Sequence, residues 1–342
     1  MREKDCHLAA NSVYRTTMHI IHFLDIPLYL AIIIVLLKIK SKHFQHYKYY
    51  LIWHTLLNEA TEFHNSYLML PVVHLPYPLL RCTGILAEFG FSGLFLFYVL
   101  SILIIQTGCS ILEMFYFRYR ASLFDYKTRN FSKLVKTLIF LCRFCVILFP
   151  ILTFSTFYYS IERQELYKQE LVQNSPSIFP EVTCYSVVLA APFSDSVMIG
   201  TMILWFSLII ITFSVIPSTT IYLNSELRSS SQMSPAVVKM QKMLLWSLIV
   251  QSFIHGIMLG VPNILFVYAI FFGADYELPA YIAFISITFH GFFSSIAMIY
   301  FTKPIQTGVF ELVKQSLSCC PCLSSSPLSP NAPKAAPPEI LD

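Results

Sequence analysis

Four polar side chains recur along one stretch of the sequence at the spacing of a helix face. His54, Asn58, Glu62 and Asn65 lie at i, i+4, i+8 and i+11, and Glu59 lies beside them. Residues with this spacing point to one side of a helix. Their imidazole, amide and carboxyl groups can exchange hydrogen bonds and protons. We expect a buried polar network that either shifts between a resting and an active state or statically joins the helices.

An arginine lies deep inside another apolar stretch, 134–158. Arg143 is about nine residues from the inner end of that stretch, which corresponds to about 14 Å along a helix. Glu59 lies at a similar depth in its own stretch, so the depths predict a Glu59–Arg143 ion pair. The alternative is that the Arg143 side chain extends to the inner membrane interface.

The composition indicates what kind of protein holds these groups. The 342 residues are 56% hydrophobic, 15% aromatic and 12% charged, and a soluble domain carries about twice that charged fraction. Such a chain lacks the polar residues that a water-exposed surface needs. The composition therefore excludes a soluble enzyme, a disordered chain and a nucleic-acid binder, and it indicates an integral membrane protein in contact with lipid.

Seven apolar stretches are long enough to cross a bilayer. Each span should be helical, because backbone N–H and C=O groups cannot stay without hydrogen bonds inside a bilayer. We therefore predict an all-α membrane protein, with a seven-transmembrane helix bundle over 19–302. An extracellular tail, 1–18, precedes the bundle, and a cytoplasmic tail, 303–342, follows it. The predicted spans are about 20–37, 49–70, 84–112, 134–158, 197–222, 243–271 and 279–301.

The basic residues predict the orientation of the bundle. The stretches after spans one, three, five and seven hold 16 Lys and Arg residues, whereas the amino terminus and the other three loops hold 6. Because basic loops remain in the cytosol, the amino terminus is expected outside. Asn130, in the Asn-Phe-Ser acceptor sequence, then lies in the cytosol and should carry no sugar.

The cytoplasmic tail shows two patterns. Val309, Phe310, Val313 and Leu317 recur at helical spacing and predict a short amphipathic helix on the inner leaflet. The Ser/Pro-rich sequence from about 323 predicts disorder. Three tail cysteines are candidates for palmitoylation: Cys319, Cys320 and Cys322. They lack a nearby fourth ligand, so no metal site is expected there.

Several local sequences resemble those of the nematode serpentine chemoreceptors. They are 48–51 (KYYL), 71–78 (PVVHLPYP), 241–251 (QKMLLWSLIVQ) and His290-Gly291 ahead of Lys303-Pro304. The resemblance covers about 18–315, with class H nearest and class I next. Ile305-Gln306 replaces the Tyr-Arg that the family usually has, and the charged end of span three matches only loosely.

The resemblance implies a chemosensory receptor that signals through a heterotrimeric G protein. It also implies a place in the plasma membrane and, within it, a sensory cilium. Arg118 and Arg120, at the end of span three, would face the G protein. A small molecule or peptide would bind in the outer half of the bundle. The candidate ligand-binding residues are Phe91, Phe95, Tyr98, His255, Asn263 and His290. The aromatic ones could equally serve plain helix packing.

The outer cysteines suggest a disulfide. Many receptors of this architecture join the loop after span four to the start of span three, which by analogy predicts a Cys82–Cys184 bridge. Cys6, in the outer tail, is the competing partner.

A second function class remains open. Asp25, Glu59, Glu62, Glu88 and Glu113 could line a proton or cation path in an ion channel or transporter. The odd number of spans and the lack of an internal repeat argue against this alternative. The sequence shows no catalytic motif and no phosphate-binding loop, so neither an enzyme nor a cofactor is expected.

Overall fold

The computed structural model describes residues 6, 10–40, 44–74, 77, 79–121, 130–175, 178–189, 196–229, 235–262, 264–265, 268 and 277–318. Its helices are α1 (Ser12–Lys38), α2 (Gln45–Phe63), η2 (His64–Met69), α3 (Ile85–Glu88), α4 (Gly93–Ala121), α5 (Asn130–Ser155), α6 (Phe157–Asn174), η3 (Pro180–Thr183), α7 (Ser196–Ser229), α8 (Pro235–His255), η4 (Gly256–Gly260), α10 (Glu277–Phe301) and α11 (Lys303–Ser318). Its strands are β1 (Pro71–His74), β2 (Leu79–Cys82) and β3 (Val187–Leu189).

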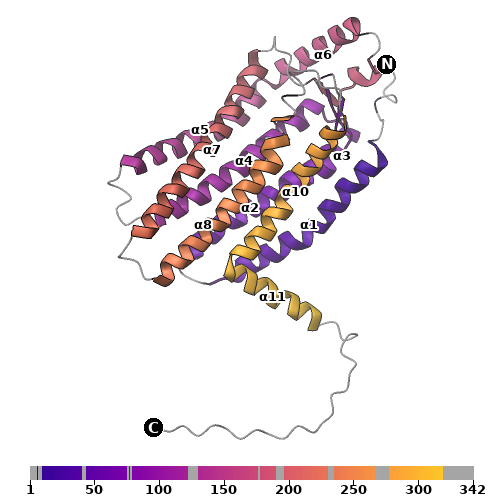
Figure 1. The fold of residues 1–342 in the computed structure, drawn as a ribbon. Coiled ribbons are helices and arrows are strands. Elements are labelled where there is room, and N and C mark those ends of the chain that lie inside the picture. The colour runs from indigo at the N-terminus through magenta and orange to yellow at the C-terminus, as the bar shows by residue number, and fades with distance from the viewer. Residues whose placement is uncertain are drawn as a thin grey trace, which may run out of the picture.

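The long helices form one bundle (Figure 1). Among the described residues, five helical segments are long and apolar enough to cross a membrane: Ser12–Lys38, Gly93–Ala121, Phe131–Ser155, Gln241–Gly260 and Ala280–Phe301. α2 packs against α1 and α4, and α7 packs against α4, α5 and α8. Apolar side chains on α5 point away from the bundle, among them Phe140, Phe144, Ile147 and Ile151. An all-α membrane bundle is confirmed.

The third long helix begins later than the predicted span 84–112. The short helix α3 occupies the beginning of that range, and α4 starts at Gly93. Between them Gly90 has φ = 83°, a left-handed conformation that glycine adopts without a steric penalty. The turn at Gly90 thus separates α3 from α4, and α4 continues to Ala121 near the basic end of the bundle.

A small antiparallel sheet covers the end of the bundle that carries the amino terminus (Figure 1). β1 pairs with β2, with Val73 opposite Leu80, and β2 pairs with β3, with Leu80 opposite Val188. The sheet was not predicted, because its strands have only three or four residues and no alternation of polar and apolar side chains. We call the sheet together with α6 and η3 the outer lid.

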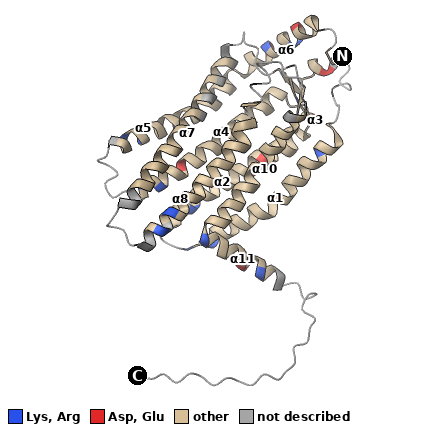
Figure 2. Ribbon diagram, in the orientation of Figure 1, with Lys and Arg blue, Asp and Glu red and all other residues tan. Residues whose placement is uncertain are grey.

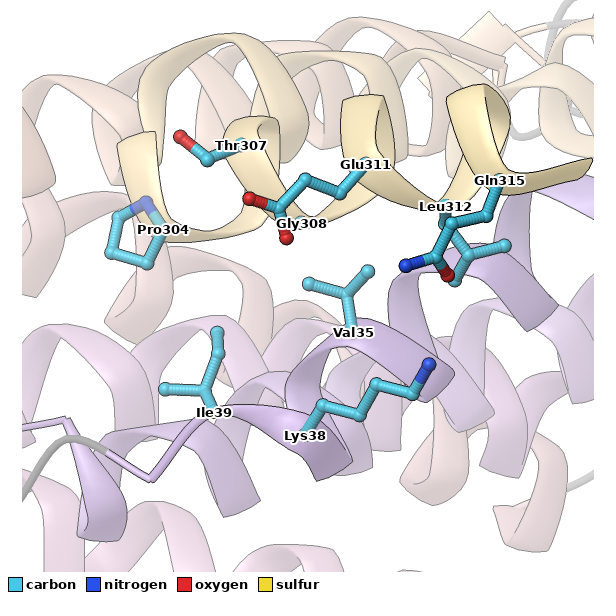
Figure 3. Close-up of a pocket in the computed structure, with 9 residues that line it drawn as sticks. All are labelled: Val35, Lys38, Ile39, Pro304, Thr307, Gly308, Glu311, Leu312 and Gln315. Carbon is cyan, nitrogen blue, oxygen red and sulfur yellow. The ribbon is translucent and has the colours of Figure 1, made fainter. Parts of the chain in front are cut away.

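The opposite end of the bundle carries α11, the helix expected after the seventh span. Pro304 lies in the first turn of α11. A backbone N–H in the first turn has no acceptor within the helix, so the absence of this group in proline costs no hydrogen bond. Gly308 contacts the Val35 side chain so closely that an added Cβ would collide with it. A pocket of about 480 Å³ lies beside this contact, between α11 and the end of α1, with Lys38 and Glu311 in its walls (Figure 3).

The charged residues are unevenly distributed along the bundle. Figure 2 shows Lys and Arg gathered at the end where α11 leaves, including the ends of α1 and α8. α6, in the outer lid, instead mixes both signs, including Glu165 and Lys168. The distribution follows the loop charges from which the orientation is predicted.

Candidate functional site

The polar stripe of α2 faces the centre of the bundle. His54, Asn58 and Glu62 of α2 and Asn65 of η2 are all fully buried. The side-chain amide of Asn65 donates to Thr288 Oγ1 of α10 at 2.9 Å. The stripe therefore lies on one helix face, as its spacing predicts, and it contacts neighbouring helices rather than lipid.

His54 connects three helices. Its Nδ1 lies 2.7 Å from Ser110 Oγ of α4, and the Ser110 hydroxyl donates to the Thr107 carbonyl. Since the Ser110 proton is used there, His54 Nδ1 donates and His54 Nε2 accepts. Nε2 lies 3.2 Å from Asn58 Nδ2 and 3.3 Å from Ser294 Oγ of α10. A neutral His54 with its proton on Nδ1 satisfies these contacts.

Two further histidines extend the network. The His255 ring of α8 lies 5.1 Å from the His54 ring and 5.2 Å from the His290 ring of α10, between centroids. His255 Nδ1 donates to the Gln251 carbonyl at 2.8 Å, and His255 Nε2 lies 3.4 Å from Asn58 Oδ1. A neutral His255 has one proton for these two acceptors. We call His54, Asn58, His255 and His290 the central network.

The Glu62 carboxylate joins α2 to α10 next to the central network. Its Oε1 accepts the backbone N–H of Gly291 at 2.9 Å. A Cβ added to Gly291 would collide with Glu62 Oε1 and with the hydroxyl of Tyr29 in α1. Glycine at this position therefore allows three helices to meet at one carboxylate.

The predicted Glu59–Arg143 ion pair is wrong. The Arg143 guanidinium instead donates from Nε and Nη2 to both carboxylate oxygens of Glu113, on α4. α5 packs against α4 and α7, whereas the Glu59 carboxylate lies 3.8 Å from His22 of α1. Equal depth in the membrane does not determine which way a side chain points around its helix, and this direction selects the partner.

The predicted Cys82–Cys184 disulfide is also wrong. Cys184 is bonded to Cys6, with 5.6 Å between the Cα atoms. Cys82 is a buried free thiol. Side chains alternate along β2, so Leu80 and Cys82 pack toward the helices while Leu79 packs on the other face with Cys184. Cys6, the competing partner, approaches Cys184 from that outer face.

Side chains of α6 hold the outer lid together. Gln164 completes the free edge of β3, since its amide donates to the Leu189 carbonyl at 2.9 Å and accepts the Leu189 N–H at 2.8 Å. Lys168 donates to the Cys184 carbonyl and to Glu165, both at 3.0 Å. Burial lowers the pKa of the Lys168 amine, and the nearby Glu165 carboxylate opposes that shift.

Two ionisable residues of the sheet are also desolvated. Burial, with a smaller contribution from the Arg81 charge, lowers the pKa of His74 to about 4. Burial also lowers the pKa of Arg81, while Glu181 and Tyr281 oppose this change. Because only His74 of the two can take up a proton in acid, we expect the lid to lose stability when His74 is protonated.

The candidate ligand-binding residues fall into separate regions. Phe95 and Tyr98 contact Phe157 at the start of α6, and Phe91 is 44% exposed on the outside of the bundle. His255 and His290 instead belong to the central network. Asn263 lies outside the described residues. The structure thus does not bring the aromatic and histidine candidates together around one cavity in the part of the chain that it describes.

The two arginines expected to face a G protein differ in burial. The Arg118 guanidinium carbon lies 3.6 Å from the ring centroid of Tyr47, and the side chain is buried. Apart from Tyr47, its Nε and Nη2 atoms face no hydrogen-bond acceptor among the described residues. Arg120 is exposed and lies 5.7 Å from the Tyr116 ring centroid. The candidate palmitoylation sites Cys319, Cys320 and Cys322 lie outside the described residues.

Sequence reasoning missed several residues of the site. Tyr47 and Tyr29 resemble ordinary apolar aromatics of a membrane helix, and His22 lies alone on its helix face. One signal for His22 was available, because it precedes Asp25 by three residues and therefore shares its side of α1. For Gly291 the signal in the sequence was its position directly after His290, a polar residue within an apolar span.

The comparisons with known proteins agree with this architecture. The model of the family "Serpentine type 7TM GPCR chemoreceptor Srh" matches residues 9–315. Among the curated proteins, none matches the chain. The matched range includes the bundle, the outer lid, the central network and most of α11. The chain therefore belongs to the Srh family of serpentine seven-transmembrane chemoreceptors.

Proposed function

We propose that the protein binds a small molecule or peptide from the outer side and transmits the signal through the bundle to a heterotrimeric G protein. The observation that carries the proposal is the central network. His54, Asn58 and His255, with Ser110 and Ser294, connect α2, α4, α8 and α10. A ligand that changes the packing of one helix would change hydrogen bonds on the other three.

The network contains a contact that can exist in two forms. When His255 is neutral and its Nδ1 donates to the Gln251 carbonyl, its Nε2 carries no proton. Nε2 and Asn58 Oδ1, 3.4 Å apart, are then both acceptors and form no hydrogen bond. A proton on Nε2, or a rotated Asn58 amide, would replace this contact with a hydrogen bond. An incompletely satisfied polar network inside a membrane therefore favours a bundle with two arrangements, which is what a receptor requires.

The helices near the network deviate from α geometry. η2 and η4 are π-helical segments that continue α2 and α8, and such segments occur frequently at functional sites. Pro262 follows η4 and is buried, so the helix loses a backbone hydrogen bond there. We infer that η4 and Pro262, which continue α8, form the hinge.

The basic end of the bundle fits a cytosolic G-protein surface. Arg118 and Arg120 are in the last turn of α4, at the end where Lys and Arg gather (Figure 2). This charge distribution supports an outer amino terminus, a place in the plasma membrane and, by family, a sensory cilium.

A channel or transporter is the second candidate, because Asp25 and Glu62 are buried and Glu59 lies close to them. However, Glu113 is paired with Arg143 on the outside of the bundle, and Glu88 belongs to α3 near the lid. The five acids thus do not form one file across the membrane.

The test is a ligand screen in cells that express the receptor with a calcium or cyclic-nucleotide reporter. An active compound should evoke a response that Asn58→Ala and His255→Gln each reduce at least tenfold at equal surface expression. The control is Ser218→Ala, since Ser218 is exposed and bonds only its own helix. Ion flux through purified protein in liposomes, without a G protein, would instead support a channel.

A further inference from the structure

A cluster of ionisable groups lies between α1 and α2, beside the central network. His22 of α1 and Glu59 and Glu62 of α2 each direct one ligand atom to a common point, and these atoms lie within 4.8 Å of one another. Asp25, one turn below His22 on α1, lies within hydrogen-bonding range of Glu62. His22, Asp25 and Glu62 are at most 2% exposed.

The groups in this cluster lack the partners that burial requires. Among the described residues, His22 Nδ1, Asp25 Oδ2, Glu59 Oε2 and Glu62 Oε2 have no hydrogen-bond partner. Among the described residues, no Lys or Arg forms an ion pair with the Asp25, Glu59 or Glu62 carboxylate. Three carboxyl groups and one imidazole in a membrane helix pair are therefore short of positive charge, which is costly at this depth.

A shared proton accounts for only part of this arrangement. A proton between Asp25 and Glu62 would give those two side chains a hydrogen bond. It would leave Glu59 Oε2 unsatisfied, and the distance of 3.8 Å between His22 Nε2 and Glu59 Oε1 is too long for a hydrogen bond. A cation at the common point would contact His22, Glu59 and Glu62 together.

The donor set selects the kind of cation. One imidazole nitrogen with two carboxylate oxygens suits zinc and related transition metals, whereas calcium and magnesium prefer oxygen alone. Two ligands at about 2.1 Å from zinc lie about 3.4 Å apart in a tetrahedral site. The ligand atoms here lie within 4.8 Å of one another. A movement of less than about 1 Å by each atom toward the metal would bring them to the spacing of a zinc site.

We propose that His22, Glu59 and Glu62 form a binding site for a divalent transition-metal ion such as Zn²⁺. The Asp25 carboxylate adds negative charge beside the ion. A bound ion would join α1 to α2 and, through the Glu62–Gly291 contact, to α10. Because α2 and α10 also carry residues of the central network, the metal would stabilise one arrangement of the bundle, a regulatory role beyond ligand detection.

The cluster lies at the level of the first half of α1. His22 lies ten residues below the start of α1, about 15 Å along the helix. His19, one turn nearer the outer end, stacks on Tyr67 with ring centroids 4.2 Å apart. The Glu59 side chain is 30% exposed, so the site is not sealed within the protein.

The test uses the purified full-length receptor in nanodiscs, with any polyhistidine tag removed, titrated with Zn²⁺ alone. We expect one saturable site per receptor and a rise in melting temperature. His22→Gln and Glu59→Gln should each weaken Zn²⁺ binding at least tenfold. Glu59→Gln is the milder change for folding, since Glu59 is partly exposed.

Two control variants locate the ion. His19→Gln removes a neighbouring histidine outside the cluster, and His46→Gln removes an exposed histidine at the other end of α2, so both should keep the wild-type affinity. Co²⁺ in place of Zn²⁺ should give visible d–d bands without the near-ultraviolet thiolate band that Cys109 and Cys142 would produce.

Three results would overturn the proposal: no Zn²⁺ binding, loss of binding in His46→Gln, or binding of Ca²⁺ but not Zn²⁺. None of them depends on ligand response or G-protein signalling. A failure here is therefore distinguishable from a failure of the proposed receptor function.

Discussion

The guanidinium of Arg118 lies 3.6 Å from the ring centroid of Tyr47, so the inner ends of α4 and α2 are joined by a buried cation–π contact. An arginine held in this way is buried and does not present its charge at the surface of the bundle. Release of Arg118 would expose two donors that face no acceptor other than Tyr47 among the described residues. We therefore predict that this contact acts as a lock, favouring one arrangement of the bundle over another.

Replacing the Tyr47 ring tests this lock. A desolvated cation–π contact contributes about 2 kcal/mol, equivalent to about a 30-fold shift between two states. We therefore expect Tyr47→Ala to raise ligand-independent signalling several-fold, measured by the reporter assay and normalised to surface expression.

Tyr47→Phe keeps the ring and removes only the hydroxyl that Arg118 faces, so it should keep most of the low basal signal. Unchanged basal signalling in Tyr47→Ala at normal surface expression would show that the contact only contributes to folding.

The outer disulfide gives a second prediction. Non-reducing peptide mapping should recover Cys6 joined to Cys184. Cys6→Ser and Cys184→Ser should each lower the free energy of unfolding by about 2–4 kcal/mol, less where the bilayer already restrains the ends. The measurement is thermal unfolding in detergent, with and without reductant.

Cys82→Ser is the control for this bridge, since Cys82 is a free buried thiol on the bundle side of β2. The variant should retain the Cys6–Cys184 peptide pair. A Cys82–Cys184 pair in the wild-type protein would contradict the structure.

The contrast between α2 and the outer lid shows how much could be predicted from the sequence. The spacing of His54, Asn58 and Glu62 predicts a shared buried face, because helix periodicity alone determines it. The choice of Cys6 over Cys82 depends on which face of β2 each side chain occupies. That in turn depends on a sheet formed by segments about 110 residues apart, for which short strands leave no local signal.

The ion pairs show the same limit inside the bundle. The depth of Arg143 follows from its position in an apolar stretch, and both Glu59 and Glu113 are acids within reach of neighbouring helices. Only the packing of α5 on α4 selects Glu113. Likewise, the sequence shows His22 as one histidine among apolar residues. Only the packing of α1 on α2 brings it close to Glu59 and Glu62.

The Glu113–Arg143 pair makes a third prediction. Breaking a buried pair costs about 3–5 kcal/mol, and we expect a smaller loss here because the Arg143 side chain is 51% exposed. Glu113→Gln and Arg143→Gln should each reduce surface expression, and the double variant should recover part of it, as measured by flow cytometry.

The comparison pair for this cycle is Glu59→Gln with Arg143→Gln. These residues are not partners in the structure, so their losses should add. Recovery in that pair, with simple addition for Glu113 and Arg143, would show that the structure assigns the wrong acid.

The last prediction concerns the response of the outer lid to acid. The pKa of His74 is about 4 in the folded lid, whereas a solvated histidine titrates near 6.5. Above pH 6.5 the imidazole is neutral in both the closed and the opened lid and does not affect their balance. As the pH falls from 6.5 toward 4, His74 becomes protonated in the opened lid but stays neutral in the closed lid. The closed lid therefore loses stability relative to the opened lid across this pH range. The loss is less than about 1.4 kcal/mol per pH unit, because the ring is partly exposed.

The groups around His74 agree with this direction. Arg81 opposes a second positive charge, the Glu181 carboxylate only partly offsets it, and the Phe179 ring, 4.4 Å away between centroids, supplies no acceptor. Thermal unfolding at pH 7 and pH 5 should therefore show a larger acid-induced fall in melting temperature for the wild type than for His74→Gln. The difference between the two proteins isolates His74 from the other histidines. An equal fall in both would mean that the acid response arises elsewhere, with the histidines of the central network as the next groups to substitute.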